Sequence, residues 1–191
     1  SDGESERRIG AAIAAAGGLA PDALVITKVD ARGADYSGDR VRASVDESRS
    51  RLGLDHLPLV HLHDPEYFDF ADLTAPGGAV DALVALRSAG VVGSIGLAGG
   101  RVQEMERYLA LGVFDALLVH NRWTLVDRSA GDLLDRAEQQ GLGLINAAVY
   151  GGGLLAAAVP PPDARYGYRP APPEVLDAVA AMRAACGRHG V

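Results

Sequence analysis

Cysteine is almost absent from this sequence, because Cys186 is the only one among 191 residues. An internal disulfide is therefore excluded, and we interpret Cys186 as a buried, unreactive thiol. The first residues also lack the basic, then apolar, then small-residue order of a secretion signal. These absences favour a reducing, cytoplasmic location.

Long apolar runs and an excess of positive charge are missing as well. A mean hydropathy of +0.08, with 23% charged residues, argues against a membrane protein. The net charge of −7 and the scattering of arginines among carboxylates argue against a nucleic-acid partner, because a polyanion needs a clustered basic surface. We expect a small-molecule substrate, and the sequence leaves the oligomeric state open. No composition shift divides the chain, so we predict one domain over residues 1–191.

The sequence does contain short apolar runs of strand composition that end abruptly. Five runs have this character: Leu24–Lys28, Leu59–His63, Val92–Leu97, Phe114–His120 and Leu142–Val149. Apolar residues at helical spacing separate them, and further helices are predicted at Ser5–Ala16 and Glu174–Ala185. The segment 159–173 holds six of the ten prolines, and we interpret it as a surface loop.

This alternation predicts an α/β protein whose parallel sheet is covered by helices. Five strands are compatible with a complete, open, doubly wound sheet. They are equally compatible with part of an eight-stranded barrel, which typically needs about 250 residues. Periodicity does not separate the two.

Polar residues stand at the ends of several predicted strands, as Lys28, His63 and His120 do, with Asn146 near the end of the last. Ligands bind at the carboxyl ends of parallel strands, so these residues are candidates for a site. Lys28 in particular could lower the pKa of a neighbour, act as a Schiff-base nucleophile, or form a plain salt bridge.

Two further patterns carry weaker signals. His61 shares a strand face with His63, but no third ligand or His-Glu-X-X-His motif accompanies the pair, so we expect no metal. The glycine run Gly93–Gly100 does not match the dinucleotide fingerprint of open α/β sheets.

Taken in order, several motifs resemble those of the aldo-keto reductase family. They are Ser5–Gly10, Ile26–Lys28, Ser44–Asp55, Leu62–Pro65, Ser94–Leu97 and Gly153–Leu155. The segments His120–Leu125 and Asn146–Gly151 most resemble the sugar-dehydrogenase branch, the D-threo-aldose and L-galactose dehydrogenase-like proteins. The resemblance covers nearly the whole chain. It implies a (β/α)8 TIM barrel of which this chain supplies about five βα units.

In that family a hydride passes between NAD or NADP and a carbonyl or sugar substrate without a metal, and a Tyr-Lys-Asp-His group handles the proton. The resemblance places Lys28 and His63 on the Lys and His of that group. A tyrosine of ordinary pKa, near about 10, donates a proton poorly at neutral pH unless a nearby ammonium stabilises its phenolate. Lys28 would supply that charge, and His63 would hydrogen-bond the substrate oxygen.

The resemblance also implies what this chain lacks. The Asp and Tyr belong to a strand and loop preceding Ser5, so neither Tyr36 nor Tyr67 takes that place. The last strand and the loop that grips the adenosine phosphate follow Val191, so we expect the chain to be truncated at both ends. NAD and NADP are therefore not distinguished.

The family's cofactor-binding positions match six residues here: Ala98, Gly99, His120, Ala147, Tyr150 and Gly152. Ala98, Gly99 and His120 stand where a Ser-Asn pair and a Gln usually hold the nicotinamide amide, and Ala147 replaces a stacking tyrosine.

Two other functions remain open. Lys28 could be the Schiff-base lysine of an aldolase-like barrel. Alternatively, the chain could be a catalytically inactive remnant or a dinucleotide-binding module.

Overall fold

The computed structural model describes residues 2–156 and 163–190. Its centre is a parallel sheet with the strand order β1-β2-β3-β4-β5. The strands are β1 (Ile26–Val29), β2 (Leu57–His63), β3 (Val92–Gly99), β4 (Ala116–His120) and β5 (Gly143–Ala147). Each overlaps one of the five predicted runs. The bounds differ from the predicted ones by at most two residues at either end; β3 extends to Gly99, and β1 starts only where pairing with β2 begins, at Ile26 opposite Leu59.

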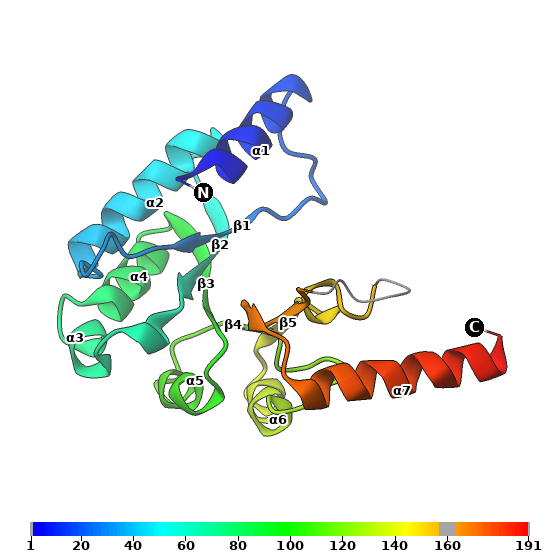
Figure 1. Cartoon of the computed structure of the whole chain (residues 1–191). Helices are drawn as coiled ribbons and strands as arrows, with labels where there is room; N and C mark the ends of the chain where they lie inside the picture. The colour runs from blue at the N-terminus through cyan, green and yellow to red at the C-terminus, as the bar shows by residue number, and fades with distance from the viewer. Residues whose placement is uncertain (1, 157–162, 191) are drawn as a thin grey trace.

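Helices precede, separate and follow the strands (Figure 1). The longer ones are α1 (Glu4–Ala15), α2 (Gly38–Leu52), α4 (Ala79–Ser88), α5 (Val102–Leu109), α6 (Gly131–Gln139) and α7 (Pro173–His189). Short turns are η1 (Pro65–Tyr67), α3 (Phe70–Thr74) and η2 (Gly151–Gly153). The ends of α2 follow from local chemistry. Ser37 Oγ accepts a hydrogen bond from the Arg40 backbone nitrogen at the start, and Gly53 adopts a φ of 68° at the end.

The strand order confirms the barrel that the family resemblance implies, where periodicity alone left an open, doubly wound sheet possible. A doubly wound sheet reverses its strand order at a switch point, so its helices cover both faces. Here the order increases without reversal, and right-handed crossovers then place every connecting helix on the same face. Figure 1 accordingly shows α2, α4, α5 and α6 along the outside of the strands. This is the arrangement of a (β/α)8 barrel, of which the chain forms five strands.

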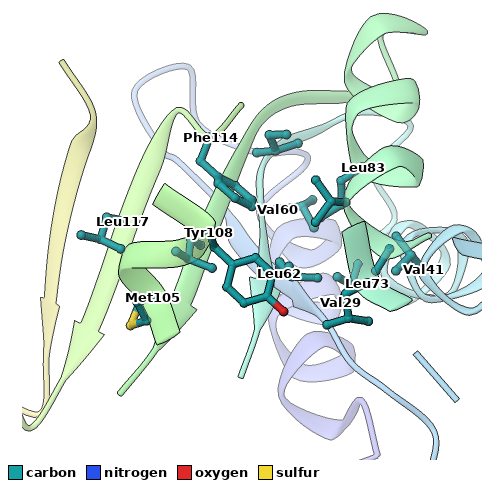
Figure 2. Packing of buried hydrophobic residues seen from close by; sticks show 14 of the residues in the cluster. Val29, Val41, Val60, Leu62, Leu73, Leu83, Met105, Tyr108, Phe114 and Leu117 are labelled. Atoms are coloured by element: carbon teal, nitrogen blue, oxygen red, sulfur yellow. The ribbon is translucent and has the colours of Figure 1, made fainter. Parts of the chain in front are cut away.

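The main core lies between the strands and these outer helices (Figure 2). Val60 and Leu62 of β2 are fully buried; Val60 lies beside Leu83 of α4, and Leu62 lies nearer Tyr108 of α5. Met105 and Tyr108 bury one face of α5. Burying a side chain of this size stabilises the fold by about 1.5–3 kcal/mol. This packing holds the strands, and therefore the polar residues at their ends, in fixed register.

The last part of the chain differs from expectation in two ways. Residues 165–166 and 169–170 form a small antiparallel hairpin, β6 (Arg165–Tyr166) and β7 (Arg169–Pro170), where a loop was predicted. Its Tyr166 is buried and donates a hydrogen bond to the Asn121 carbonyl oxygen over 2.6 Å, which fixes the hairpin to the segment after β4. Residues 157–162 of the predicted loop lie outside the described residues.

The prediction that Cys186 is buried is also wrong. Cys186 is exposed, because it lies on α7, a helix of which Val179 alone is buried among the described residues. None of the helices in the described ranges combines the length and apolar character needed to cross a lipid bilayer.

Candidate functional site

The parallel register brings the predicted strand-end residues to one edge of the sheet. Lys28 is level with His61, and His63 is level with Ala98. Further along the sheet, His120 is level with Ala147. All of these positions lie at or near the carboxyl ends of their strands, the edge where ligands bind in parallel α/β proteins.

A cavity of about 740 Å³ opens beside β1, between that strand, α1, α2 and the end of β2. Lys28, Asp30, His63, Asp64 and Tyr67 are among its lining residues. Lys28 and His63 therefore share one cavity, as their proposed roles require.

Lys28 is half-buried in this cavity. Within the described ranges no hydrogen bond or ion pair joins its ammonium group to another residue, so the salt bridge considered from the sequence is not found there. The positive charge of Lys28 acts on its neighbours instead, because it opposes protonation of both His61 and His63.

His63 forms the closest polar contact of the cavity. Its Nδ1 lies within hydrogen-bonding range of Asp30 Oδ1. This bond raises the pKa of His63, with help from the charge of Asp64, against burial and the charge of Lys28. The same bond lowers the pKa of Asp30. The apolar run did not mark Asp30, which follows β1 directly; extended backbone continued past Val29 would place it on the same face as Lys28, two residues earlier.

The side chain of Tyr36 holds the backbone of His63 in place. The Tyr36 hydroxyl lies 2.8 Å from the Val29 carbonyl oxygen and 2.9 Å from both the backbone nitrogen and the carbonyl oxygen of His63. It therefore accepts from one amide and donates to a carbonyl, joining the ends of β1 and β2. Burial raises the pKa of Tyr36. Tyr36 thus has a structural role and is not the tyrosine that donates a proton to the substrate.

His61 has a different environment from His63. It is fully buried, level with Gly96, where an added Cβ would lie 2.4 Å from the His61 ring. Neither ring nitrogen makes a hydrogen bond of normal geometry to any described residue. Burial lowers the pKa of His61 to about 4, and the charge of Lys28 contributes in the same direction. In the part of the chain that the structure describes, no group of three His, Cys, Asp or Glu residues could hold a metal ion.

The six positions matched to cofactor binding lie beyond this cavity, at the ends of β3, β4 and β5. Ala98 and Gly99 end β3, His120 ends β4 and Ala147 ends β5, while Tyr150 and Gly152 follow β5. None of them is among the described residues that line the 740 Å³ cavity. The Tyr150 side chain is 63% exposed and accessible to a ligand.

Glu66 is a second residue that the sequence analysis missed. It is buried in η1, and its Oε1 accepts hydrogen bonds from the backbone nitrogens of Gly100 (2.7 Å) and Arg101 (3.1 Å). Its Oε2 is buried with no hydrogen-bond partner among the described residues, and an added Cβ on Gly99 would lie 2.2 Å from it. Glu66, which lies just after β2, therefore holds the loop that follows β3 in place.

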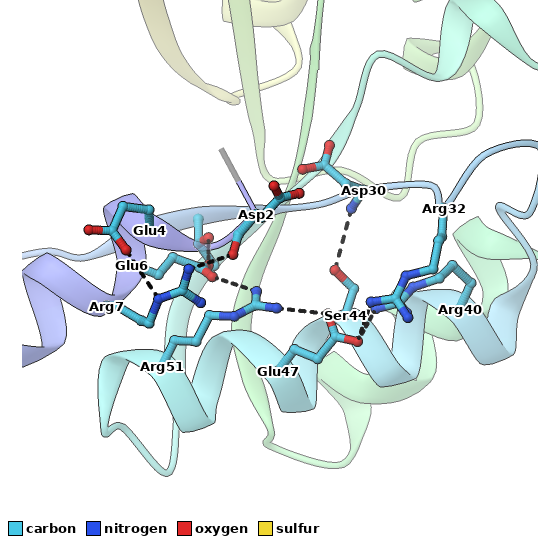
Figure 3. Close-up of polar contacts among 11 residues, drawn as sticks. Asp2, Glu4, Glu6, Arg7, Asp30, Arg32, Arg40, Ser44, Glu47 and Arg51 are labelled. Carbon is cyan, nitrogen blue, oxygen red and sulfur yellow. Dashed lines mark hydrogen bonds and ion pairs between the residues drawn. The ribbon is translucent and has the colours of Figure 1, made fainter.

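An ion-pair network closes the far side of the cavity (Figure 3). The Arg51 guanidinium bridges Glu6 of α1 (3.0 Å) and Glu47 of α2 (3.1 Å). Arg40 contacts Glu47 at 2.9 Å, and Thr27 donates to Glu6 over 2.5 Å. The network connects α1, β1 and α2 around the lysine-bearing strand.

The whole length of the chain, residues 1–191, matches the sequence model of the Aldo/keto reductase family. The chain is 36% identical over 158 residues to D-threo-aldose 1-dehydrogenase of Pseudomonas sp, covering 82% of this chain and 47% of that protein. It is 31% identical over 191 residues to L-galactose dehydrogenase of Arabidopsis thaliana, covering 97% of this chain and 58% of that protein. The chain thus spans about half the length of these relatives.

Solved structures show the same likeness. The holo form of aldo-keto reductase AKR11C1 from Bacillus halodurans superimposes with a TM-score of 0.73 at 21% identity, covering 94% of this chain and 56% of that one. A structure described as a putative 2,5-diketo-D-gluconic acid reductase B matches with a TM-score of 0.60 at 29% identity, covering 78% of this chain and 50% of that one. The first of these supports the fold alone.

Proposed function

Because the chain belongs to the aldo/keto reductase family, we propose that the whole protein is an NAD(P)-dependent oxidoreductase acting on a sugar or another small carbonyl or alcohol substrate. The observation that carries this proposal is the position of Lys28 and His63. They lie at the ends of adjoining parallel strands and line one cavity, at the positions that the resemblance gives to the family's Lys and His. The similarity to an aldose and a galactose dehydrogenase supports a sugar as the substrate.

In this proposal Lys28 acts through its charge. An ammonium without an ion-pair partner among the described residues is free to stabilise a phenolate beside it. The proton-donating tyrosine and its aspartate would come from residues outside these 191, in line with the family's motif order. His63 would orient the substrate oxygen through a hydrogen bond from its ring.

The ends of β3, β4 and β5 fit the cofactor in two respects. Ala98 and Gly99 offer no side-chain donor, but the unpartnered Oε2 of Glu66 beside Gly99 is an acceptor suited to an amide N–H group. The exposed ring of Tyr150 offers a flat surface after β5. The nicotinamide dinucleotide would supply or accept the hydride when bound.

The decisive experiment uses the full-length protein. Aldoses and aldehydes are assayed with NAD and NADP by following the absorbance of the reduced nicotinamide. Lys28→Met and His63→Asn should each lower kcat by roughly 10²–10⁴-fold, the range for a lost acid–base group. The exposed Arg188→Met and His189→Asn, both on α7, serve as matched controls and should keep full activity.

Other outcomes separate the remaining hypotheses. Lys28→Arg keeps the positive charge, so residual turnover in that variant favours a charge role over a Schiff base. Lys28 is the only lysine among the 191 residues, so borohydride trapping of a carbonyl substrate on this segment would identify it directly and would contradict the proposal. Dinucleotide binding without any turnover would indicate an inactive binding module.

A further inference from the structure

We propose that Asp30 is a positioning residue for His63. Its carboxylate accepts the hydrogen bond from Nδ1, which leaves Nε2 directed at a substrate oxygen in the cavity. The inference deepens the proposed function and rests on it. It adds to Lys28 and His63 a third residue, one that acts only through the imidazole.

The strand register accounts for the contact. Val29 is level with Leu62, so the residues that follow them, Asp30 and His63, reach the same height at the edge of the sheet. Residues at the same level of neighbouring parallel strands point to the same side. Asp30 Oδ1 and His63 Nδ1 therefore meet across the strand ends.

Both partners are held by their backbones. The amide nitrogen of Asp30 lies 3.4 Å from Ser44 Oγ on α2, at the limit of a hydrogen bond (Figure 3). The amide nitrogen of His63 donates to the buried Tyr36 hydroxyl over 2.9 Å. The backbones of both residues are therefore anchored, although the Asp30 side chain itself is 67% exposed.

Among the described residues, none makes a hydrogen bond to the other ring nitrogen of His63, Nε2. The nearest carboxylate to Nε2 is that of Asp64, whose Oδ2 lies 3.7 Å away, beyond hydrogen-bonding distance. When Nδ1–H is bound by Asp30, Nε2 is the only ring position that a substrate oxygen can contact. A carboxylate behind a functional histidine fixes both the ring orientation and the tautomer.

The charges around His63 act in opposing directions. Asp30 just after β1 and Asp64 just after β2 favour the imidazolium, while burial and Lys28 on β1 oppose it. The carboxylates prevail, and the pKa of His63 is raised. Asp30 thus keeps the ring protonated to higher pH, so that Nε2–H donates to the substrate oxygen.

Nuclear magnetic resonance of the ring nitrogens in the full-length protein tests this inference without requiring turnover. The His63 signals are assigned by their loss in His63→Asn. In the wild type we expect a bound Nδ1–H and a pKa above that of a free histidine. Asp30→Asn retains an acceptor but removes the charge, so the His63 pKa should fall by on the order of 1 unit while the tautomer is kept. Asp30→Ala should lose both the raised His63 pKa and the fixed tautomer, and the exposed Asp22→Asn should change neither property.

Kinetics supply the second measurement. Both Asp30 variants should lower kcat with little change in the KM for the dinucleotide. Asp30→Asn should also move the alkaline limb of the pH profile of kcat to lower pH, by as many pH units as the His63 pKa falls in the resonance titration. A His63 titration and tautomer identical in wild type and in Asp30→Ala would overturn the inference, whatever the activity. If the Asp30 variants change the His63 ring as expected but the full-length protein shows no turnover, the result would instead contradict the proposed function.

Discussion

The Tyr36 hydroxyl lies 2.9 Å from both the backbone nitrogen and the carbonyl oxygen of His63. A buried side chain from the loop before α2 thus holds the end of β2, where the site begins. The geometry of His63 depends on this contact from 27 residues away as much as on its own strand.

Tyr36→Phe should destabilise the full-length protein by about 1–3 kcal/mol, because removing the hydroxyl leaves buried backbone groups without partners. Urea unfolding followed by circular dichroism measures the change in the free energy of unfolding. Tyr67→Phe is the matched control, since the Tyr67 side chain is 63% exposed and should cost almost nothing. Equal effects in the two variants would contradict the proposed support of His63.

Acid should destabilise the fold through His61. The pKa of His61 is about 4 in the folded state and near about 6.5 when unfolded, so the unfolded chain binds more protons between these values. Stability should therefore fall as the pH drops from 6.5 towards 4, by up to about 3 kcal/mol from this group. Unfolding free energies across this range should lose that slope in His61→Asn and keep it in the exposed control His56→Gln. An unchanged slope in His61→Asn would show that another group is responsible.

Glu66→Ala should loosen the loop after β3, because the backbone nitrogens of Gly100 and Arg101 lose their common acceptor. We expect a loss of about 1–3 kcal/mol and faster amide hydrogen exchange at these two residues. Glu66→Gln retains one carbonyl oxygen and should preserve most of the protection. The exposed pair residue Glu104 provides a control, since Glu104→Ala removes only a surface ion pair worth about 1 kcal/mol or less. If amide exchange at Gly100 is the same in Glu66→Ala as in the wild type, the carboxylate does not hold this loop.

Gly10→Ala should disturb the packing of α1 on α2. An added Cβ at this position would lie 2.1 Å from the Arg51 carbonyl oxygen, so the helices would have to separate. Overpacking of this kind costs about 1–3 kcal/mol and should accelerate amide exchange throughout α1. Gly187→Ala is the control, because no atom of residues 2–156 or 163–190 lies within 4 Å of its Cβ position and alanine favours a helix. Normal protection of α1 in Gly10→Ala would contradict this packing.

The 191 residues expressed alone should associate. Within the described residues β1 and β5 are each paired on one side only, and Ile26 and Leu144 on these strands are 40% and 43% exposed. Unpaired strand edges with apolar side chains promote edge-to-edge association. Light scattering should show less association for Ile26→Lys with Leu144→Lys than for the control Leu125→Lys, which lies outside the strands. A monomeric segment with a cooperative melt would refute this prediction.

The local pattern of the sequence determined the elements and the ends of the strands. Apolar runs separated by helical spacing predicted five parallel strands, and each strand ended within two residues of its predicted end, because a strand packed beneath helices needs a continuous apolar segment. Lys28 and His63 were identifiable for the same reason, since a polar residue closing such a run must lie at the open edge of the sheet. Periodicity left an open sheet possible, the family motifs implied a barrel, and the strand order confirms the barrel.

The tertiary structure alone decided how these residues are held. Asp30 meets His63 across a separation of 33 residues, Tyr36 reaches the same histidine across 27, and Glu66 reaches Gly100 across 34. Each contact depends on the relative register of two strands and on the path of the loop between them. That register is set by the summed packing of the whole core, which no single stretch of sequence contains.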